Sequence, residues 1–142
     1  MKERNINFLE KYKTVDKLIK DAFGTKDGVT EYIRLMESKN SIGIKKVPSW
    51  KDDYFKLKHA RWVRNQLAHE ASIDSDICKK EDYDWLCGFC NRLLKGQDAL
   101  ALLSNKTKKS MSVKHKDRKR SAIWFIAVAI VIIAVFLLLR IS

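Results

Sequence analysis

Hydrophobic side chains near the start of the chain recur at intervals of three and four residues, which is the spacing of one helix face. In residues 5–23 they alternate with charged side chains, and the pattern stops at Gly24. The same spacing returns in residues 29–36, directly after Asp27, whose side chain is a good helix cap. The sequence therefore predicts two amphipathic helices, a long one followed by a shorter one.

Residues 38–48 contain Asn40, Gly43 and Pro48 and predict a connection, with a short extended piece at residues 42–44. A third amphipathic helix is predicted to follow this connection. It starts at Ser49, which precedes an acidic residue by three positions as in a capping box, and it runs to about residue 69.

A polar loop is expected at residues 70–78, and apolar positions then keep three- and four-residue spacing from about residue 79 to 103 despite Gly96. We find no convincing alternating run of strand residues. Four amphipathic helices with short loops favour an all-α fold, an antiparallel up-and-down four-helix bundle over residues 1–104.

The C-terminal part has a different composition. Residues 105–120 hold eight basic residues and one acidic residue, which predicts a flexible basic tether. Residues 122–139 are an unbroken apolar run, about 27 Å long as a helix, so one C-terminal transmembrane helix is predicted over 121–141. Because the basic block precedes it, we expect a single-pass membrane protein with a cytoplasmic N-terminal domain.

The net charge and the cysteine content limit the kinds of protein that the sequence can encode. The net charge is +12, but residues 1–104 hold 20 basic and 16 acidic residues, so the predicted domain is only mildly basic. The first ten residues lack the apolar core of a secretory signal, and three cysteines do not predict a disulfide framework. We interpret Cys87 and Cys90 as buried, inert thiols, and predict no metal and no cofactor.

The most chemically capable side chains lie near the end of the third predicted helix. Arg64 carries a planar guanidinium suited to phosphate oxygens, Asn65 an amide, and His69 an imidazole, the side chain that commonly changes protonation near neutral pH. Asn65 and His69 share a helix face, whereas Arg64 and His69 lie about 140° apart around the axis. A joint site of Arg64 and His69 therefore needs a distorted last turn, long side-chain reach or a second copy of the chain.

Arg64, Asn65 and His69 stand as R-N-x-x-x-H, which resembles the R-x4-6-H signature of HEPN domains (higher eukaryotes and prokaryotes nucleotide-binding). The order of helices, with the motif ending the third, is also similar to that family. Members of one branch carry R-x4-H-x-Y, but this chain has Ala71 at the tyrosine position, so control through that tyrosine is not implied.

The resemblance implies a metal-independent endoribonuclease that acts in toxin, defence or stress systems and works as a homodimer on RNA, with a cognate antitoxin or other regulator as a further partner. His69 would activate the ribose 2′-hydroxyl or protonate the leaving oxygen, Arg64 would hold the scissile phosphate, and Asn65 would position the substrate or His69. Arg61 and Lys58 are candidate RNA contacts on the same helix.

Less specific interpretations of these side chains stay open. Arg64 could form a surface ion pair, and His69 could cap the last helical turn. His59 is expected on the helix surface, and Trp50, Trp62 and Trp85 in a core or dimer seam. The alternative function is a non-catalytic, membrane-anchored helical adaptor that dimerises or recruits a partner.

Overall fold

The computed structural model describes residues 3–69 and 77–110, and the regular structure in these residues is helical, without strands. The all-α prediction is therefore confirmed for the described chain. Most of the predicted loop at residues 70–78, most of the predicted tether and the predicted transmembrane helix at 121–141 lie outside the described residues.

The three helices predicted in the first half of the chain are confirmed. They are α1 (Glu3–Phe23), α2 (Gly28–Ser38) and α4 (Trp50–His69). The first ends where expected, because Gly24 has a φ of +64°, a conformation that residues with a Cβ rarely adopt.

The predicted connection at residues 38–48 is wrong in part, because it contains a short helix, α3 (Asn40–Lys46), in place of an extended piece at 42–44. Gly43 lies in this helix against the indole of Trp50, and a Cβ at this position would overlap the ring. The Trp50 indole nitrogen also donates a hydrogen bond to Asn40 Oδ1 at 3.1 Å. Gly43 contributed to the prediction of a loop, but its small size instead allows α3 to pack closely against the Trp50 ring.

The fourth helix is shorter than its hydrophobic pattern predicted. Helix α5 (Lys80–Leu94) ends before Gly96, which has a φ of +61° and whose amide donates to Leu93 O at 3.1 Å. This glycine terminates the helix in the usual left-handed way. A separate helical segment occupies residues 99–110, so the first six residues of the predicted tether are helical.

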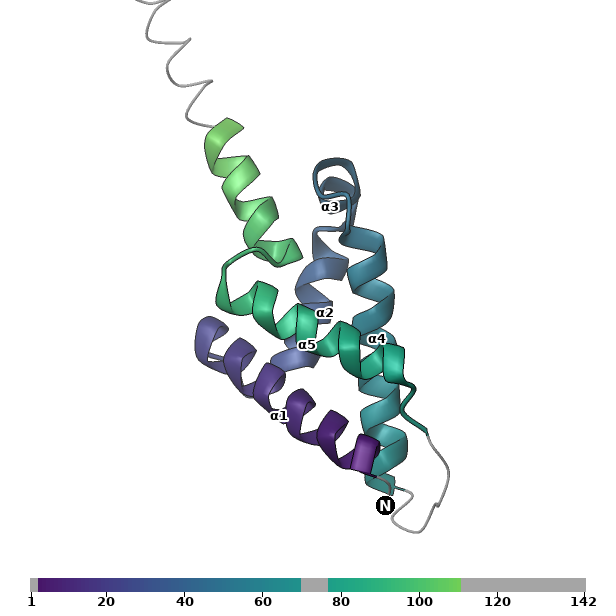
Figure 1. The fold of residues 1–142 in the computed structure, drawn as a ribbon. Coiled ribbons are helices and arrows are strands. Elements are labelled where there is room, and N and C mark those ends of the chain that lie inside the picture. The colour runs from purple at the N-terminus through teal and green to yellow at the C-terminus, as the bar shows by residue number, and fades with distance from the viewer. Residues whose placement is uncertain (1–2, 70–76, 111–142) are drawn as a thin grey trace, which may run out of the picture. The chain divides into compact units, whose positions relative to one another are not determined.

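Figure 1 shows the arrangement of the helices. Helix α1 packs against α5, α2 and α4, and α2 also packs against α4. α1 and α5 run in the same direction, and Asn5 near the start of α1 accepts a hydrogen bond from Cys78 N just before α5, at 3.2 Å. In the predicted antiparallel up-and-down bundle, the first and last helices would run in opposite directions. The parallel arrangement of α1 and α5 therefore differs from that prediction.

One core lies within residues 3–103 and draws on all the helices except α3. Its largest fully buried side chains are Trp50, Tyr32, Phe8, Phe89, Ile19, Met36, Leu57 and Leu86. The predicted core position of Trp50 is thus confirmed, while Trp62 is 52% exposed. Core burial on this scale fixes the relative positions of α1, α2 and α4, and these helices form the candidate site.

A second unit of the chain begins at Ser104, and the structure describes only its residues 104–110, which are helical. Among the residues described, no helix combines the length and apolar composition that a membrane span needs.

Candidate functional site

A polar cleft of about 390 Å³ lies between α1, the start of α2 and the second half of α4. This volume is near the lower end of the range of small-ligand sites, roughly 300–1,000 Å³. The cleft is lined by Tyr12, Asp16, Lys20, Asp27, Thr30, Arg61, Arg64 and Asn65. It is rich in charged groups, with three cationic and two acidic side chains.

The α4 wall of the cleft consists of Arg61, Arg64 and Asn65. Their spacing of three and four residues places them on neighbouring positions of one helix side. Arg64 Nη1 donates a hydrogen bond to Asn65 Oδ1 at 3.1 Å, which orients the amide beside the guanidinium. Two of the three predicted catalytic residues are therefore brought together with the predicted RNA contact Arg61.

The opposite wall is held by Asp16 of α1. One of its carboxylate oxygens accepts a hydrogen bond from Val29 N at 2.8 Å and so caps the first turn of α2, and the other pairs with Lys20 at 2.7 Å. Gly28 permits this contact, because a Cβ there would overlap the Asp16 backbone. Both oxygens of the Asp16 carboxylate therefore already have partners, Val29 N and Lys20, on the same side of the cleft.

Tyr12 of α1 lines the same cleft, although only 7% of the residue is exposed. Burial, together with the negative charge of Asp16, raises the pKa of Tyr12 to about 12, and the Arg64 and Arg61 guanidinium groups act in the opposite direction. The phenol is therefore a neutral hydrogen-bond donor at physiological pH, and both arginines are close enough to influence it.

His69 and Lys58 do not line the cleft. His69 is the last residue of α4 and is solvent-exposed, one turn beyond Asn65. Lys58 is exposed and lies against Tyr54, with Nζ 3.2 Å from the hydroxyl oxygen. The cleft thus includes the guanidinium predicted to hold the phosphate but not the imidazole predicted to be catalytic.

The five cleft residues from α1 and α2 were not expected from the sequence. Tyr12 was assigned to the hydrophobic face of its helix, and nothing in its spacing separates a core tyrosine from one whose hydroxyl reaches a cleft. Asp27 was expected to cap a helix, and Asp16, Lys20 and Thr30 were not assigned a role from the sequence. Their convergence depends on how α1 and α2 pack against α4, which local patterns do not specify.

His59 occupies the surface of α4 as predicted and makes specific contacts. Its Nε2 lies 3.1 Å from Asp82 Oδ1 of α5, and its ring stacks on Trp62 with centroids 5.7 Å apart. A smaller cavity of about 110 Å³ lies beside this contact, between α4 and α5. These interactions account for His59 as a link between two helices.

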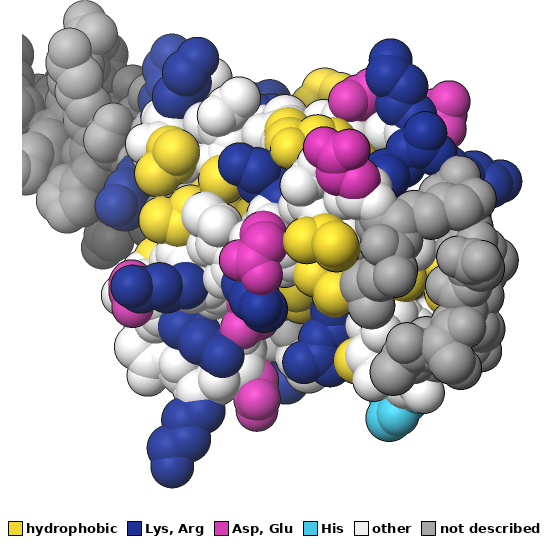
Figure 2. Space-filling model, turned by 60° about the horizontal axis from the view of Figure 1, so that its bottom comes forward, with side chains coloured by type: hydrophobic (Ala, Val, Ile, Leu, Met, Phe, Trp, Pro, Cys, Tyr) yellow, Lys and Arg dark blue, Asp and Glu magenta, His cyan; other side chains and the backbone are white. Residues whose placement is uncertain are grey.

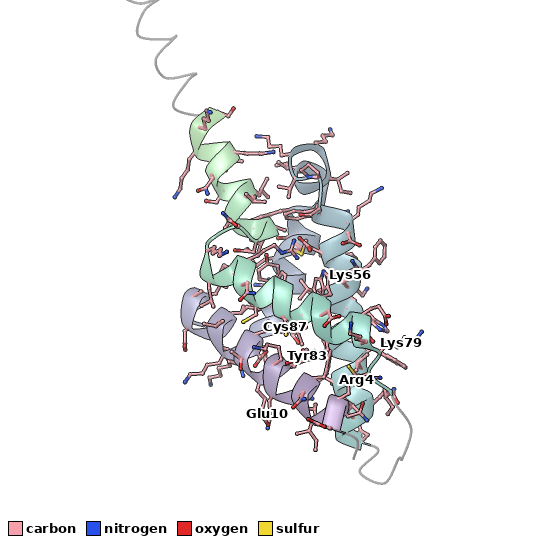
Figure 3. All side chains as sticks on the ribbon, in the orientation of Figure 1. Arg4, Glu10, Lys56, Lys79, Tyr83 and Cys87 are labelled. Atoms are coloured by element: carbon pink, nitrogen blue, oxygen red, sulfur yellow. The ribbon has the colours of Figure 1, made fainter. Side chains whose placement is uncertain are left out.

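Cys87 and Cys90 were predicted to be buried thiols, and the prediction is confirmed for Cys90; Cys78 is buried as well. Cys87 is only partly buried and lies one turn from Tyr83 on α5 (Figure 3), to which it is hydrogen-bonded. This hydrogen bond is the main cause of a raised Tyr83 pKa. Within residues 3–69 and 77–110, no three cysteine, histidine or acidic side chains are placed to share a metal ion.

The surface charge agrees with the mild basicity expected for the domain. On the face shown in Figure 2, lysine and arginine side chains are interspersed with acidic and hydrophobic ones and form no continuous basic sheet. On this face, the described residues offer no broad basic surface for a nucleic acid.

Comparison with known proteins identifies a family but no characterised relative. No curated protein and no solved structure matches the chain. Residues 6–123 match the model of a family described only as a family of unknown function, DUF6548. That match spans most of the 142 residues, and the chain therefore belongs to the DUF6548 family.

Proposed function

We propose that this chain is a membrane-tethered, metal-independent endoribonuclease of HEPN type. The observation that carries the proposal is the convergence of Arg64, Asn65 and Arg61 on one polar cleft, with His69 exposed at the end of the same helix. Two guanidinium groups in a cleft match the charge and geometry of phosphate oxygens. The membrane tether rests on the apolar run at residues 122–139.

In the proposed reaction, the ribose 2′-oxygen attacks the adjacent phosphorus, and the bond from phosphorus to the 5′-oxygen breaks. The products are a 2′,3′-cyclic phosphate and a 5′-hydroxyl end, without an external oxidant or cofactor. Arg64 stabilises the extra negative charge of the transition state. His69 either accepts the 2′-hydroxyl proton or donates a proton to the leaving oxygen.

The separation of Arg64 from His69 within one chain leads us to include a homodimer in the proposal. His69 does not line the cleft, so in our proposal the imidazole that meets a phosphate held by Arg64 comes from a second copy of the chain. Exposed aromatic side chains on α4, Phe55 at 65% and Trp62 at 52%, supply apolar surface for such an association.

The test uses the full chain in detergent, incubated with single-stranded RNA in the presence of a metal chelator. Cleavage with cyclic-phosphate ends is expected, whereas DNA and 2′-O-methylated RNA should stay intact. His69→Ala should lower the rate about 100-fold or more. His115→Ala, which alters a histidine of the predicted tether, is the matched control and should retain activity. RNA left intact by the wild-type protein, or equal rates for wild type and His69→Ala, would refute the proposal.

A second candidate function is a non-catalytic, membrane-anchored adaptor, and the exposure of Phe55 and Trp62 is the observation that favours it. The adaptor predicts that Phe55→Ser with Trp62→Ser abolishes self-association or partner capture, while no variant affects RNA. Sedimentation of the full chain beside the RNA assay separates the two functions. Loss of association together with loss of cleavage supports the nuclease, and loss of association without any cleavage in the wild type supports the adaptor.

A further inference from the structure

Tyr12 presents a polar group that the fold itself does not use. The residue is 7% exposed, and its ring packs near Phe8 with centroids 6.3 Å apart. Its hydroxyl belongs to the cleft and makes no hydrogen bond to any residue in the described part of the chain. Among the described residues, no buried side-chain oxygen or nitrogen lacks a hydrogen-bond partner, so the unpartnered Tyr12 hydroxyl is open to the cleft and available to a group that enters it.

The two arginines beside Tyr12 also have no carboxylate partner among residues 3–69 and 77–110. Elsewhere in the described chain, Arg34 pairs with Glu31 at 2.6 Å and Arg92 with Asp53 at 2.6 Å. Within the described residues, Arg61 forms no ion pair, and Arg64 has only its hydrogen bond to Asn65. As far as the structure describes the chain, the cleft therefore leaves two guanidinium groups available to an anionic ligand.

The acidic side chains of the cleft limit what that ligand can be. The Asp16 carboxylate is satisfied by Val29 N and Lys20, so Asp27 is the acidic group left to oppose the two free arginines. With Lys20 included, three cations face two carboxylates, a net charge of +1. A tetrahedral anion with several acceptor oxygens uses this set best, because it can accept from two guanidinium groups and a hydroxyl together.

We propose that the cleft of a single chain binds one phosphate group, with Tyr12 donating a hydrogen bond to an oxygen that Arg61 and Arg64 also contact. The inference rests on the proposed function for its RNA substrate and extends it with a positioning residue from α1. The phosphate comes from an RNA backbone or from a free nucleotide, and both present the same oxygens. Capture of phosphate then needs one chain, whereas cleavage needs His69 as well.

The experiment measures binding of three probes to the full chain in detergent by calorimetry: inorganic phosphate, uridine 3′-monophosphate and a short single-stranded RNA with 2′-O-methyl groups that block cleavage. Tyr12→Phe removes only the hydroxyl and should weaken each phosphate ligand about 10- to 100-fold, the range expected for a hydrogen bond to a charged group. Tyr54→Phe is the matched control, because its exposed hydroxyl bonds Glu37 away from the cleft, and it should bind as the wild type does.

The arginines are tested in the same assay. Arg61→Gln should weaken binding of every probe, and Arg61→Lys should recover part of it, because it restores charge without the planar fork. Arg34→Gln, an exposed arginine on α2, should have no effect on affinity. Tight binding of RNA with weak binding of both small probes would assign the site to the RNA backbone, and the reverse would assign it to free nucleotides.

His69→Ala separates this inference from the nuclease proposal, since it should abolish cleavage and leave phosphate binding unchanged. Binding by a wild-type protein that never cleaves RNA would refute the nuclease and retain the phosphate site. Equal affinities of Tyr12→Phe and wild type, or no binding of any probe, would refute the phosphate site.

Should Tyr12→Phe fail to fold, the wild-type protein labelled with ¹³C at the tyrosine ζ carbon replaces it. The Tyr12 signal should shift when inorganic phosphate is added, and the Tyr54 signal should not. An unmoved Tyr12 signal at saturating phosphate would overturn the assignment.

Discussion

The carboxylate of Asp53 in α4 accepts hydrogen bonds from both terminal nitrogens of Arg92 in α5, at 2.6 and 3.2 Å. Asp53 is fully buried, while 31% of the Arg92 side chain is exposed. A bidentate pair restricts the orientation of the two groups as well as their separation. It therefore ties the helix that carries the cleft arginines to α5.

Replacing Arg92 with Leu should lower the free energy of unfolding by about 3 kcal/mol, because it leaves a buried carboxylate without its partner. Asp53→Leu combined with Arg92→Leu should recover part of the loss by removing that charge. Urea denaturation followed by circular dichroism measures both. Arg34→Leu, which breaks a solvent-exposed pair, should lower the free energy of unfolding far less than Arg92→Leu does. An Arg92→Leu protein as stable as Arg34→Leu would show that the buried pair does not stabilise the fold.

Gly43→Ala should destabilise the protein by about 1–3 kcal/mol, because the added methyl overlaps the buried Trp50 ring. Gly88→Ala in α5 is the matched control, since a Cβ there meets no other atom within 4 Å. It should stabilise the protein by up to about 1 kcal/mol through higher helix propensity. Thermal midpoints of the two variants should therefore move in opposite directions, and a shared direction would contradict the packing described for α3.

Tyr32→Phe should weaken the start of the helical segment at residues 99–110. The Tyr32 hydroxyl donates to Asp98 Oδ1 at 2.6 Å and accepts from Leu100 N at 3.1 Å, and all three groups are buried. Its loss should cost about 1–3 kcal/mol. Hydrogen exchange of the Leu100 amide should accelerate more than that of core amides in α1. Unchanged exchange at Leu100 would be inconsistent with this role.

Alkaline pH should destabilise the protein in part through Tyr12. Its pKa is about 12 in the folded chain and near 10 in an unfolded one. The folded state holds the phenol proton more tightly, so this contribution is complete below about pH 10 and is lost as the pH rises toward 12. In denaturation measured across that window, Tyr12→Phe should lose less stability than Tyr54→Phe. Equal slopes for the two variants would argue against a buried, protonated Tyr12.

Helix positions near the chain start were predictable because their hydrophobic spacing and boundary residues agree. Gly24 ends α1 as expected. Gly43, predicted in a loop, lies inside a helix, and Gly96, predicted inside a helix, lies just after the end of one. Gly43 serves helix packing and Gly96 ends a helix whose apolar pattern continues beyond it. A glycine alone does not specify which of these roles it takes, since each is decided by the partner that approaches it.

The candidate site was predictable only along α4. Arg64 and Asn65 are neighbours in sequence, so any helix presents them together, and Arg61 follows from helical spacing. Tyr12 and Asp16 enter the cleft through packing between α1 and α4, a contact between segments some fifty residues apart that periodicity does not encode. The helix angle predicted that Arg64 and His69 face different directions, and of these two residues only Arg64 lines the cleft.

Asp16 gives the cleft an unusual dependence on the rest of the domain. Its one carboxylate anchors the first turn of α2 and the Lys20 ammonium together, so the wall opposite the arginines is formed by the same bonds that start a helix. Widening the cleft on that side would therefore break the hydrogen bond that caps the first turn of α2. A ligand too large for the cleft would have to break these bonds in order to bind. The free energy that holds α1 and α2 together would then set which ligands the cleft accepts.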